Sequence, residues 1–379
     1  MTIRLLIVYI RAGAGHRRAA EALARAAAAA WPEADVECLD VLRSAPRWFR
    51  RLYPRAYLFL VRRTPWLWRV SYRLLDTAWV YRLVQPLRRR WNLSIASAFR
   101  RRLAERPVDA VLATHFLPAD LCNSLKRAGA LAAPLIVVVT DLYPHRFWLA
   151  ALAEAFIVAT PQSASVCVAR GIEEGRVRVL GIPVGASFAS PADPAALRAQ
   201  LGLDAGRLTV LVTSGGTTVG RFEELVERLA GLEGTHPRRL QLLVVCGEAD
   251  ETRRRLSALA AQSPMPVRVH GFVETMADCM GASDLVVAKA GGLTISEALA
   301  RGKPLIFYHV IPGQEEMNAR YVAEHHAGLI ALGPAAAAEA VAGCLSHPER
   351  LTAMQQAARS LSRPRAAADI IEQVVKPLL

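Results

Sequence analysis

The sequence predicts an α/β protein with two domains, each built on a parallel sheet. Short apolar runs rich in Val, Ile and Leu alternate with helical stretches along most of the 379 residues. That alternation is typical of parallel strands covered by helices on both faces. Two glycine-rich turns, at residues 12–16 and 288–297, follow such runs far apart in the chain. Each turn leaves polar groups at the mouth of a sheet, so we expect two sheets that face a shared cleft.

The first domain is expected over residues 1–187. Its strands are predicted at 4–9, 36–39, 108–113, 135–139, 155–158 and 177–180, where the apolar runs are short and rich in β-branched residues. An alanine-rich helix is predicted over 17–30. Residues 187–194 are small and proline-rich, which is typical of a linker.

The same pattern restarts in a second domain, expected over residues 188–360. Strands are predicted at 208–213, 240–246, 267–270, 285–288 and 305–308, with a helix starting near residue 221. The tail, residues 361–379, has the pattern of an amphipathic helix with no strand after it. We therefore expect the tail to pack back on the first domain.

Composition narrows the class of protein. The chain is 53% hydrophobic and 21% charged, which is globular rather than disordered. Its six cysteines are scattered without a CxxC pair, so we expect buried thiols in a reducing cytoplasm and no metal site. The first residues run directly into a predicted strand, so we expect no signal peptide. No apolar run reaches the roughly 18–20 residues that a membrane-spanning helix needs.

The positive charge is concentrated in residues 43–106, which we call the basic aromatic segment. It contains seventeen arginines, two acids and five of the seven tryptophans. Arginine next to tryptophan suits the headgroup layer of an anionic membrane, and we expect contact through Arg62, Arg63, Trp66 and Trp68. Two alternatives are a solvated helical surface whose aromatics pack inward, and a nucleic-acid surface. No nucleic-acid motif accompanies the segment, which favours the membrane.

The first glycine-rich turn contains Gly13, Gly15 and His16. Such a loop brings backbone N–H groups close to a ligand at a helix N-terminus. A dinucleotide fingerprint would need a third glycine where this chain has Arg18. A histidine at a helix N-terminus tends to stay neutral, which suits a general base. The alternative is that His16 only caps the helix or fills a pocket.

The second domain offers further polar turns. The turn from Ser214 through Gly215, Gly216 and Thr217 can bind a pyrophosphate through backbone amides, and it lacks the lysine of a P-loop. Glu297, on the helix after the later glycine-rich turn, can accept two ribose hydroxyls or can be an ordinary exposed glutamate. Residues 313–318 can hold sugar hydroxyls or simply begin a polar helix.

Several modest motifs occur together in a specific order. They include Val139-Thr140-Asp141-Leu142, Ser214-Gly215-Gly216 and Gly313-Gln314-Glu315, along with residues 13–16, 181–184, 246–247, 271–273, 280–284 and 289–298. In this order the chain resembles the monogalactosyldiacylglycerol synthase and processive diacylglycerol glucosyltransferase family, which is related to the MurG-type N-acetylglucosaminyltransferases. The resemblance covers about residues 3–330.

The resemblance implies a GT-B fold, in which two Rossmann-like domains with parallel sheets face a deep cleft. It implies a lipid acceptor on the N-terminal domain, beside Gly13 and Gly15, with His16 or Asp141 as the base. It also implies a UDP-sugar on the C-terminal domain. There the implied contacts are Gly271, Phe272 and Val273 for uracil; Ser214, Gly215, Gly216, Thr217, Gly291, Gly292, Leu293 and Thr294 for diphosphate; Glu297 for ribose; and Gln314 and Glu315 for hexose.

The expected activity is transfer of a hexose from a UDP-sugar to a membrane lipid such as diacylglycerol, by a single displacement that inverts the anomeric centre. Helix N-termini and backbone amides can stabilise the UDP leaving group, so no metal or cofactor is expected. We expect a cytoplasmic enzyme at the inner face of the cell membrane, without a nucleic-acid partner. The alternatives are an N-acetylglucosaminyltransferase acting on a lipid-linked saccharide, and a non-catalytic protein that binds UDP-sugars or nucleic acid.

Overall fold

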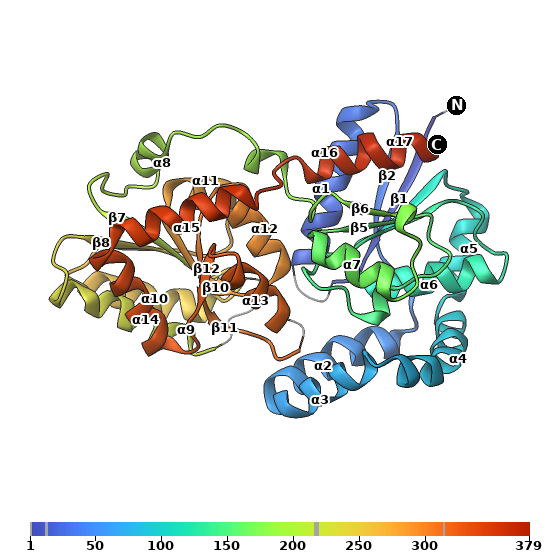
Figure 1. Ribbon diagram of the computed structural model, residues 1–379, viewed down its shortest axis with the longest axis horizontal. Helices are drawn as coiled ribbons and strands as arrows, with labels where there is room; N and C mark the ends of the chain where they lie inside the picture. Colours follow the sequence, from blue (N-terminus) through green and yellow to red (C-terminus); the bar gives the residue numbers. More distant parts are fainter. Residues whose placement is uncertain (1, 12–13, 216–219, 314) are drawn as a thin grey trace. The chain divides into compact units, whose positions relative to one another are not determined.

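The computed structural model describes residues 2–11, 14–215, 220–313 and 315–379 (Figure 1). Its contacts divide the chain into two compact units. The first unit comprises residues 1–186, 312–314 and 365–379, and the second comprises residues 187–311 and 315–364.

The first unit is built on a six-stranded parallel sheet with the order β2-β1-β3-β4-β5-β6. From β1 the chain moves outward to β2 and then returns to β3 on the other side of β1. The loops after β1 and β3 therefore leave in opposite directions, and this switch point is where open parallel sheets bind ligands. The strands are β1 (Arg4–Tyr9), β2 (Asp35–Asp40), β3 (Ala110–Ala113), β4 (Leu135–Val138), β5 (Ala155–Val158) and β6 (Val177–Val179).

Helices cover both faces of this sheet, because successive strand residues point to opposite sides. In β1, Leu6 and Val8 belong to one buried cluster, whereas Leu5 and Ile7 belong to another. The helices next to the sheet are α1 (Gly15–Ala30), α5 (Ser97–Glu105), α6 (Phe116–Arg127) and α7 (Pro161–Ala169).

Most of the basic aromatic segment forms three consecutive helices, α2 (Arg47–Arg63), α3 (Pro65–Leu75) and α4 (Ala78–Ile95), and its last part forms α5. Pro65 stands at the first position of α3, where its missing N–H and fixed φ favour a helix start. In Figure 1 these helices lie apart from the sheet, and α4 joins the rest of the unit through contacts with α6.

The C-terminal tail belongs to the first unit. It forms α16 (Ala366–Ile370), a π-helical turn (Ile371–Val375) and α17 (Lys376–Leu378), and α16 packs against α1 (Figure 1). Ile370, Ile371 and Val375 are almost completely buried, in the same cluster as Leu5 and Leu23. The tail therefore completes the core on one face of the first sheet.

The second unit contains another six-stranded parallel sheet, with the order β12-β11-β10-β7-β8-β9. Here the switch point lies between β7 and β10, because the chain leaves β7 toward β8 and leaves β10 toward β11. The strands are β7 (Leu208–Thr213), β8 (Leu240–Val245), β9 (Val267–His270), β10 (Leu285–Lys289), β11 (Leu305–His309) and β12 (Gly328–Ile330).

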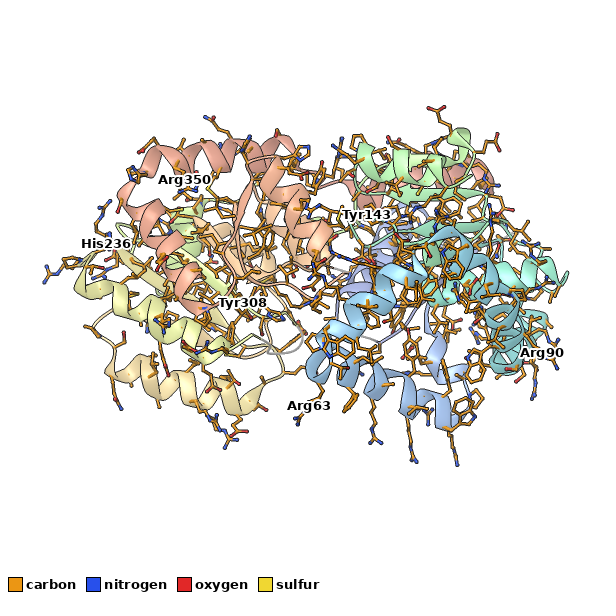
Figure 2. The ribbon with its side chains drawn as sticks, turned by 60° about the horizontal axis from the view of Figure 1, so that its bottom comes forward. Arg63, Arg90, Tyr143, His236, Tyr308 and Arg350 are labelled. Atoms are coloured by element: carbon orange, nitrogen blue, oxygen red, sulfur yellow. The ribbon has the colours of Figure 1, made fainter. Side chains whose placement is uncertain are left out.

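Eight helices within the described residues accompany this sheet. Tyr308 on β11 is 1% exposed, and it lies inside the unit in Figure 2. The helices are α8 (Pro194–Gln200), α9 (Phe222–Ala230), α10 (Asp250–Gln262), α11 (Met276–Ala282), α12 (Gly292–Ala300), α13 (Glu316–Glu324), α14 (Pro334–Ser346) and α15 (Pro348–Ser360).

The predicted strands are confirmed to within two residues at either end. The strand that was not predicted from the sequence is β12, which has only three residues and lies in the short apolar run 327–332. None of the helices in the described ranges is both long and apolar enough to cross a bilayer.

Candidate active site

Polar side chains meet at the switch point of the first sheet. His16 lies in the first turn of α1, directly after β1, while Thr114 and Thr140 follow β3 and β4. The His16 Nδ1 atom is 3.0 Å from the carbonyl oxygen of Thr114 and 2.8 Å from the hydroxyl of Thr140. Residues 98 and 124 positions away in the chain therefore fix one ring nitrogen of His16.

These contacts select one tautomer of His16. A carbonyl oxygen only accepts hydrogen bonds, so Nδ1 must carry the proton that it shares with Thr114. The Thr140 hydroxyl donates to the same carbonyl at 3.3 Å, which leaves its lone pairs to accept from Nδ1. In the neutral ring the lone pair then lies on Nε2, which is the atom that a general base needs.

His115 stands beside His16 as a second, buried imidazole. The two ring centroids are 4.5 Å apart in an edge-on arrangement. The Nδ1 atom of His115 accepts a hydrogen bond from the backbone N–H of Leu117 at 3.0 Å and so caps α6. Burial, and to a smaller extent His16, lower the pKa of His115 well below 6.5. His115 therefore remains neutral at physiological pH.

We expect the first unit to lose stability as the pH falls from 7.5 to 5.5. Burial lowers the folded-state pKa of both His115 and His145 below 6.5, whereas the unfolded chain protonates each below about pH 6.5. Their contribution is complete above that pH and declines below it, by up to about 1.4 kcal/mol per pH unit for each histidine. Urea unfolding followed by tryptophan fluorescence measures the effect, since all seven tryptophans lie in the first unit.

The histidines can be separated from other titrating groups by two variants. His115→Asn retains a side-chain cap for α6 and should flatten the pH dependence. His347→Asn, at an exposed position of the second unit, should leave it unchanged. Equal urea midpoints at both pH values in the unaltered protein would contradict the expectation.

Asp141 lies directly after Thr140 and is buried, in the loop that follows β4. This loop is tied to the turn between α3 and α4 by Asp76. The Asp76 carboxylate accepts from both terminal nitrogens of Arg170, at 2.9 and 2.7 Å, and from the backbone N–H of Arg146 at 2.8 Å. Arg170 also donates to the hydroxyl of Tyr143, labelled in Figure 2. One of the two acids of the basic aromatic segment thus anchors the segment to the loop that carries Asp141.

The basic aromatic segment exposes apolar side chains on all three helices. Trp66 on α3 and Trp79 on α4 are each 67% exposed, which excludes the alternative that the aromatics all pack inward. Each helix repeats such residues at intervals of three, four or seven positions, which keeps them on one face. The exposed apolar residues are Trp48, Leu52, Phe59, Trp66, Leu67, Val70, Leu74, Trp79, Leu83, Leu87 and Trp91.

Arginines accompany these exposed side chains. Arg63 and Arg90 are exposed and lie at the outer side of the helices in Figure 2. Trp68 is half-buried, with its ring against Tyr72, and the side chain of Arg62 is outside what the structure describes. Arg88 instead turns inward to Asp120, at 2.7 Å. The predicted membrane contact therefore rests on Arg63 and Trp66 more than on Trp68.

At the switch point of the second sheet, two turns adjoin each other after β7 and β10. Ser214 follows β7 and is completely buried, and Gly215 has a positive φ of 73°. Gly291 precedes α12, which begins without a side-chain cap. The first N–H groups of α12 therefore lack partners from within the helix, as at any helix N-terminus. The two predicted diphosphate turns are thus brought to one place.

A buried ion pair lies at the same edge of the sheet. The Nζ atom of Lys289, the last residue of β10, is 2.7 Å from Oε1 of Glu315. The other carboxylate oxygen, Oε2, accepts the backbone N–H of Ile311 at 3.0 Å. The side chain of Glu315 is 5% exposed. The predicted hexose ligand therefore already holds two partners within the second unit.

The other predicted donor residues fall into three groups. Glu297 is buried on α12, which excludes the alternative of an ordinary exposed glutamate. Gly271, Phe272 and Val273 follow β9, and the Phe272 ring is 48% exposed. Three predicted donor residues, Gly216, Thr217 and Gln314, lie outside the described residues, as does the predicted acceptor residue Gly13. The roles of all these residues stay predictions.

Sequence reasoning missed four residues at these sites: Thr114, His115, Thr140 and Lys289. Each lies within two residues of the end of a predicted strand, so their positions at the carboxyl edge of a sheet were already a signal. Within the described residues, no three His, Cys, Asp or Glu side chains gather into a group that could hold a metal.

Comparison with known proteins gives matches in both halves of the chain. Residues 16–184 match the family model described as monogalactosyldiacylglycerol (MGDG) synthase, and residues 209–374 match the glycosyltransferase family 28 C-terminal domain. Monogalactosyldiacylglycerol synthase 1 of Arabidopsis thaliana, a chloroplast protein, is 30% identical over 387 residues, covering 98% of this chain and 70% of the plant protein.

Solved structures with the same architecture include MurG of Acinetobacter baumannii, with a TM-score of 0.64 at 16% identity over 99% of both chains. Another is HepE of Anabaena in complex with UDP, with a TM-score of 0.57 at 17% identity over 100% of this chain and 99% of the other. The predicted fold class is confirmed: the chain is an α/β protein with two Rossmann-like domains, the GT-B fold.

Proposed function

Because the chain belongs to the monogalactosyldiacylglycerol synthase family of glycosyltransferases, we propose that it transfers a hexose from a UDP-sugar to diacylglycerol in a membrane. The observation that carries the proposal is the fixed tautomer of His16 at the switch point of the first sheet. A glycosyltransferase needs one group that accepts a proton from the acceptor hydroxyl, and Nε2 of His16 is suited to that task.

In this mechanism the lipid hydroxyl loses its proton to Nε2 of His16 as its oxygen attacks the anomeric carbon. The bond from that carbon to the UDP oxygen breaks on the opposite face, so the configuration inverts. The Thr114 carbonyl and the Thr140 hydroxyl keep Nδ1 protonated and stabilise the imidazolium that forms. Asp141, buried next to Thr140, is the second candidate for the base.

On the donor side, the diphosphate takes the negative charge as the bond breaks. The N-terminus of α12 and the backbone around Ser214 and Gly215 supply N–H groups for that charge. Glu297 is proposed to hold the ribose. UDP-sugar enters as a substrate, and the proposal includes no resident cofactor.

The acceptor is a lipid, so the enzyme must work at a membrane surface. The basic aromatic segment combines exposed tryptophan and leucine side chains with an excess of arginine. The apolar side chains can enter the interface while the arginines attract anionic headgroups. We propose peripheral binding to the inner face of the cell membrane through α2, α3 and α4.

The test is a transfer assay with a panel of donors. The protein is incubated with vesicles of phosphatidylcholine, phosphatidylglycerol and diacylglycerol, and with UDP-galactose, UDP-glucose or UDP-N-acetylglucosamine in turn. The expected product is a β-linked monohexosyldiacylglycerol, identified by mass and by glycosidase digestion. If sugar moves only to a lipid-linked saccharide, or is released only as free hexose, the proposed acceptor is wrong.

We expect Thr140→Val to lower kcat by about 10- to 100-fold, because it removes the hydroxyl that helps to fix the His16 tautomer. The acidic limb of the pH–rate profile should also move, since the imidazolium loses one acceptor. Thr140→Ser retains the hydroxyl and should restore most of the activity. A full rate in the valine variant, at an unchanged unfolding midpoint, would show that Thr140 does not position His16.

A further inference from the structure

The side chain of Lys289 runs between the two glycine turns of the second sheet. A Cβ atom placed on Gly215 would lie 3.2 Å from Cε of Lys289, and one placed on Gly291 would lie 3.5 Å from its Nζ. The two turns come from β7 and β10, the pair of strands at the switch point. A side chain on Gly215 would therefore press on the lysine, and one on Gly291 would touch its ammonium group at ordinary van der Waals distance, so both turns lie directly against the lysine.

The same place contains an unsatisfied hydrogen-bonding group. Ser214 is completely buried, and its hydroxyl has no hydrogen-bond partner among the described residues. A buried hydroxyl without a partner is costly, and a ligand oxygen would relieve that cost. The uncapped N-terminus of α12 adds backbone donors beside it. The ammonium group of Lys289 and the first N–H groups of α12 favour an anionic ligand at this place.

Glu315 holds Lys289 in place from the other side. One carboxylate oxygen meets Nζ at 2.7 Å and the second accepts the N–H of Ile311 at 3.0 Å, so the carboxylate cannot rotate without breaking a bond. The ammonium group has three donors, and Glu315 accepts only one of them. The remaining two N–H bonds can be given to another acceptor without breaking the ion pair.

We propose that Lys289, positioned by Glu315, binds the diphosphate of the UDP-sugar and neutralises the charge that develops on UDP as it leaves. The inference rests on the proposed function and adds a residue to its donor site. It also gives Glu315 the task of positioning a lysine, in place of contact with the hexose. Lys289 keeps its protons throughout the transfer reaction, because it acts only as a positive charge and a hydrogen-bond donor.

The experiment compares the binding of UDP and uridine by calorimetry. Lys289→Met should weaken UDP binding by about 10- to 100-fold and leave uridine binding within about twofold, because uridine has no phosphate. Lys289→Arg keeps the positive charge and should lose less affinity for UDP than Lys289→Met does. Lys303→Met is the matched control: this lysine is also partly buried in the second unit but donates to the carbonyl of Gly281, and its loss should not affect UDP.

Each outcome separates this inference from the proposed function. If the unaltered protein binds no UDP, both fail. Only the inference fails if the unaltered protein binds UDP and Lys289→Met binds UDP with the same affinity. The inference also fails if Lys289→Met loses as much affinity for uridine as for UDP. Glu315→Gln should weaken the binding of UDP and of UDP-hexose by the same factor. A loss confined to UDP-hexose would assign Glu315 to the sugar and overturn its positioning role.

Discussion

Replacing His16 with alanine should lower kcat by about 10²- to 10⁴-fold, which is the usual contribution of a general base. The affinity for UDP should stay within about twofold, because the proposed UDP-binding side chains belong to the second unit. Product formation on diacylglycerol vesicles gives the rate, and calorimetry with UDP gives the affinity. The loss should therefore appear in kcat and not in donor binding.

Three controls make the His16 result specific. Tryptophan fluorescence reports whether the first unit is still folded, since His16 also contacts His115 and Thr114. Added imidazole should restore part of the rate, because it can take the place of a missing ring. The matched variant Asp141→Ala tests the other candidate. If Asp141→Ala abolishes turnover while His16→Ala retains it, the base is Asp141.

Removing the exposed tryptophans of α3 and α4 should release the protein from anionic vesicles. The double variant Trp66→Ser, Trp79→Ser removes two side chains that are each 67% exposed in the unaltered protein. Each indole contributes its apolar area to the contact with the membrane. We expect about tenfold weaker partitioning for each tryptophan. Arg63→Gln and Arg90→Gln should each weaken vesicle binding by about fivefold at low salt, because each charge near the membrane contributes about 1 kcal/mol. The difference between these variants and the unaltered protein should shrink as salt is added.

Vesicle sedimentation with phosphatidylcholine alone and with added phosphatidylglycerol measures both effects. The second unit provides matched controls in Leu332→Ser, at a residue 60% exposed, and Arg350→Gln, which is exposed at the surface of that unit (Figure 2). Neither should change the partitioning. If the α3 and α4 variants still sediment like the unaltered protein, but lose affinity for single-stranded nucleic acid, the membrane interpretation is wrong.

Most of the fold could be predicted because parallel strands leave a strong local signal. The runs at 155–158, 208–213 and 267–270 have the same ends in the structure as in the sequence analysis. β12 was not predicted, since a strand of three residues that begins with a glycine carries too little information. The order of the strands, and with it the position of each switch point, depends on contacts between distant segments and was not predicted.

Among the site residues too, those in local motifs could be predicted and those defined by contacts between distant segments could not. His16 and Glu297 lie in motifs that can be recognised in the sequence, whereas the contacts of His16 join positions 98 and 124 residues apart. The ion pair of Lys289 and Glu315 links the end of one strand to the turn after the next. Asp76 shows the same limit: in the sequence it is a lone acid among arginines, and only the fold reveals that it binds Arg170.

The tail that completes the first core has a consequence for how the chain is made. Ile370, Ile371 and Val375 follow the second unit in the chain, yet they pack with Leu5, which precedes it. The second unit is synthesised before the first can close, so the newly made first unit exposes an apolar face during that interval. A truncation before residue 365 leaves that face permanently exposed.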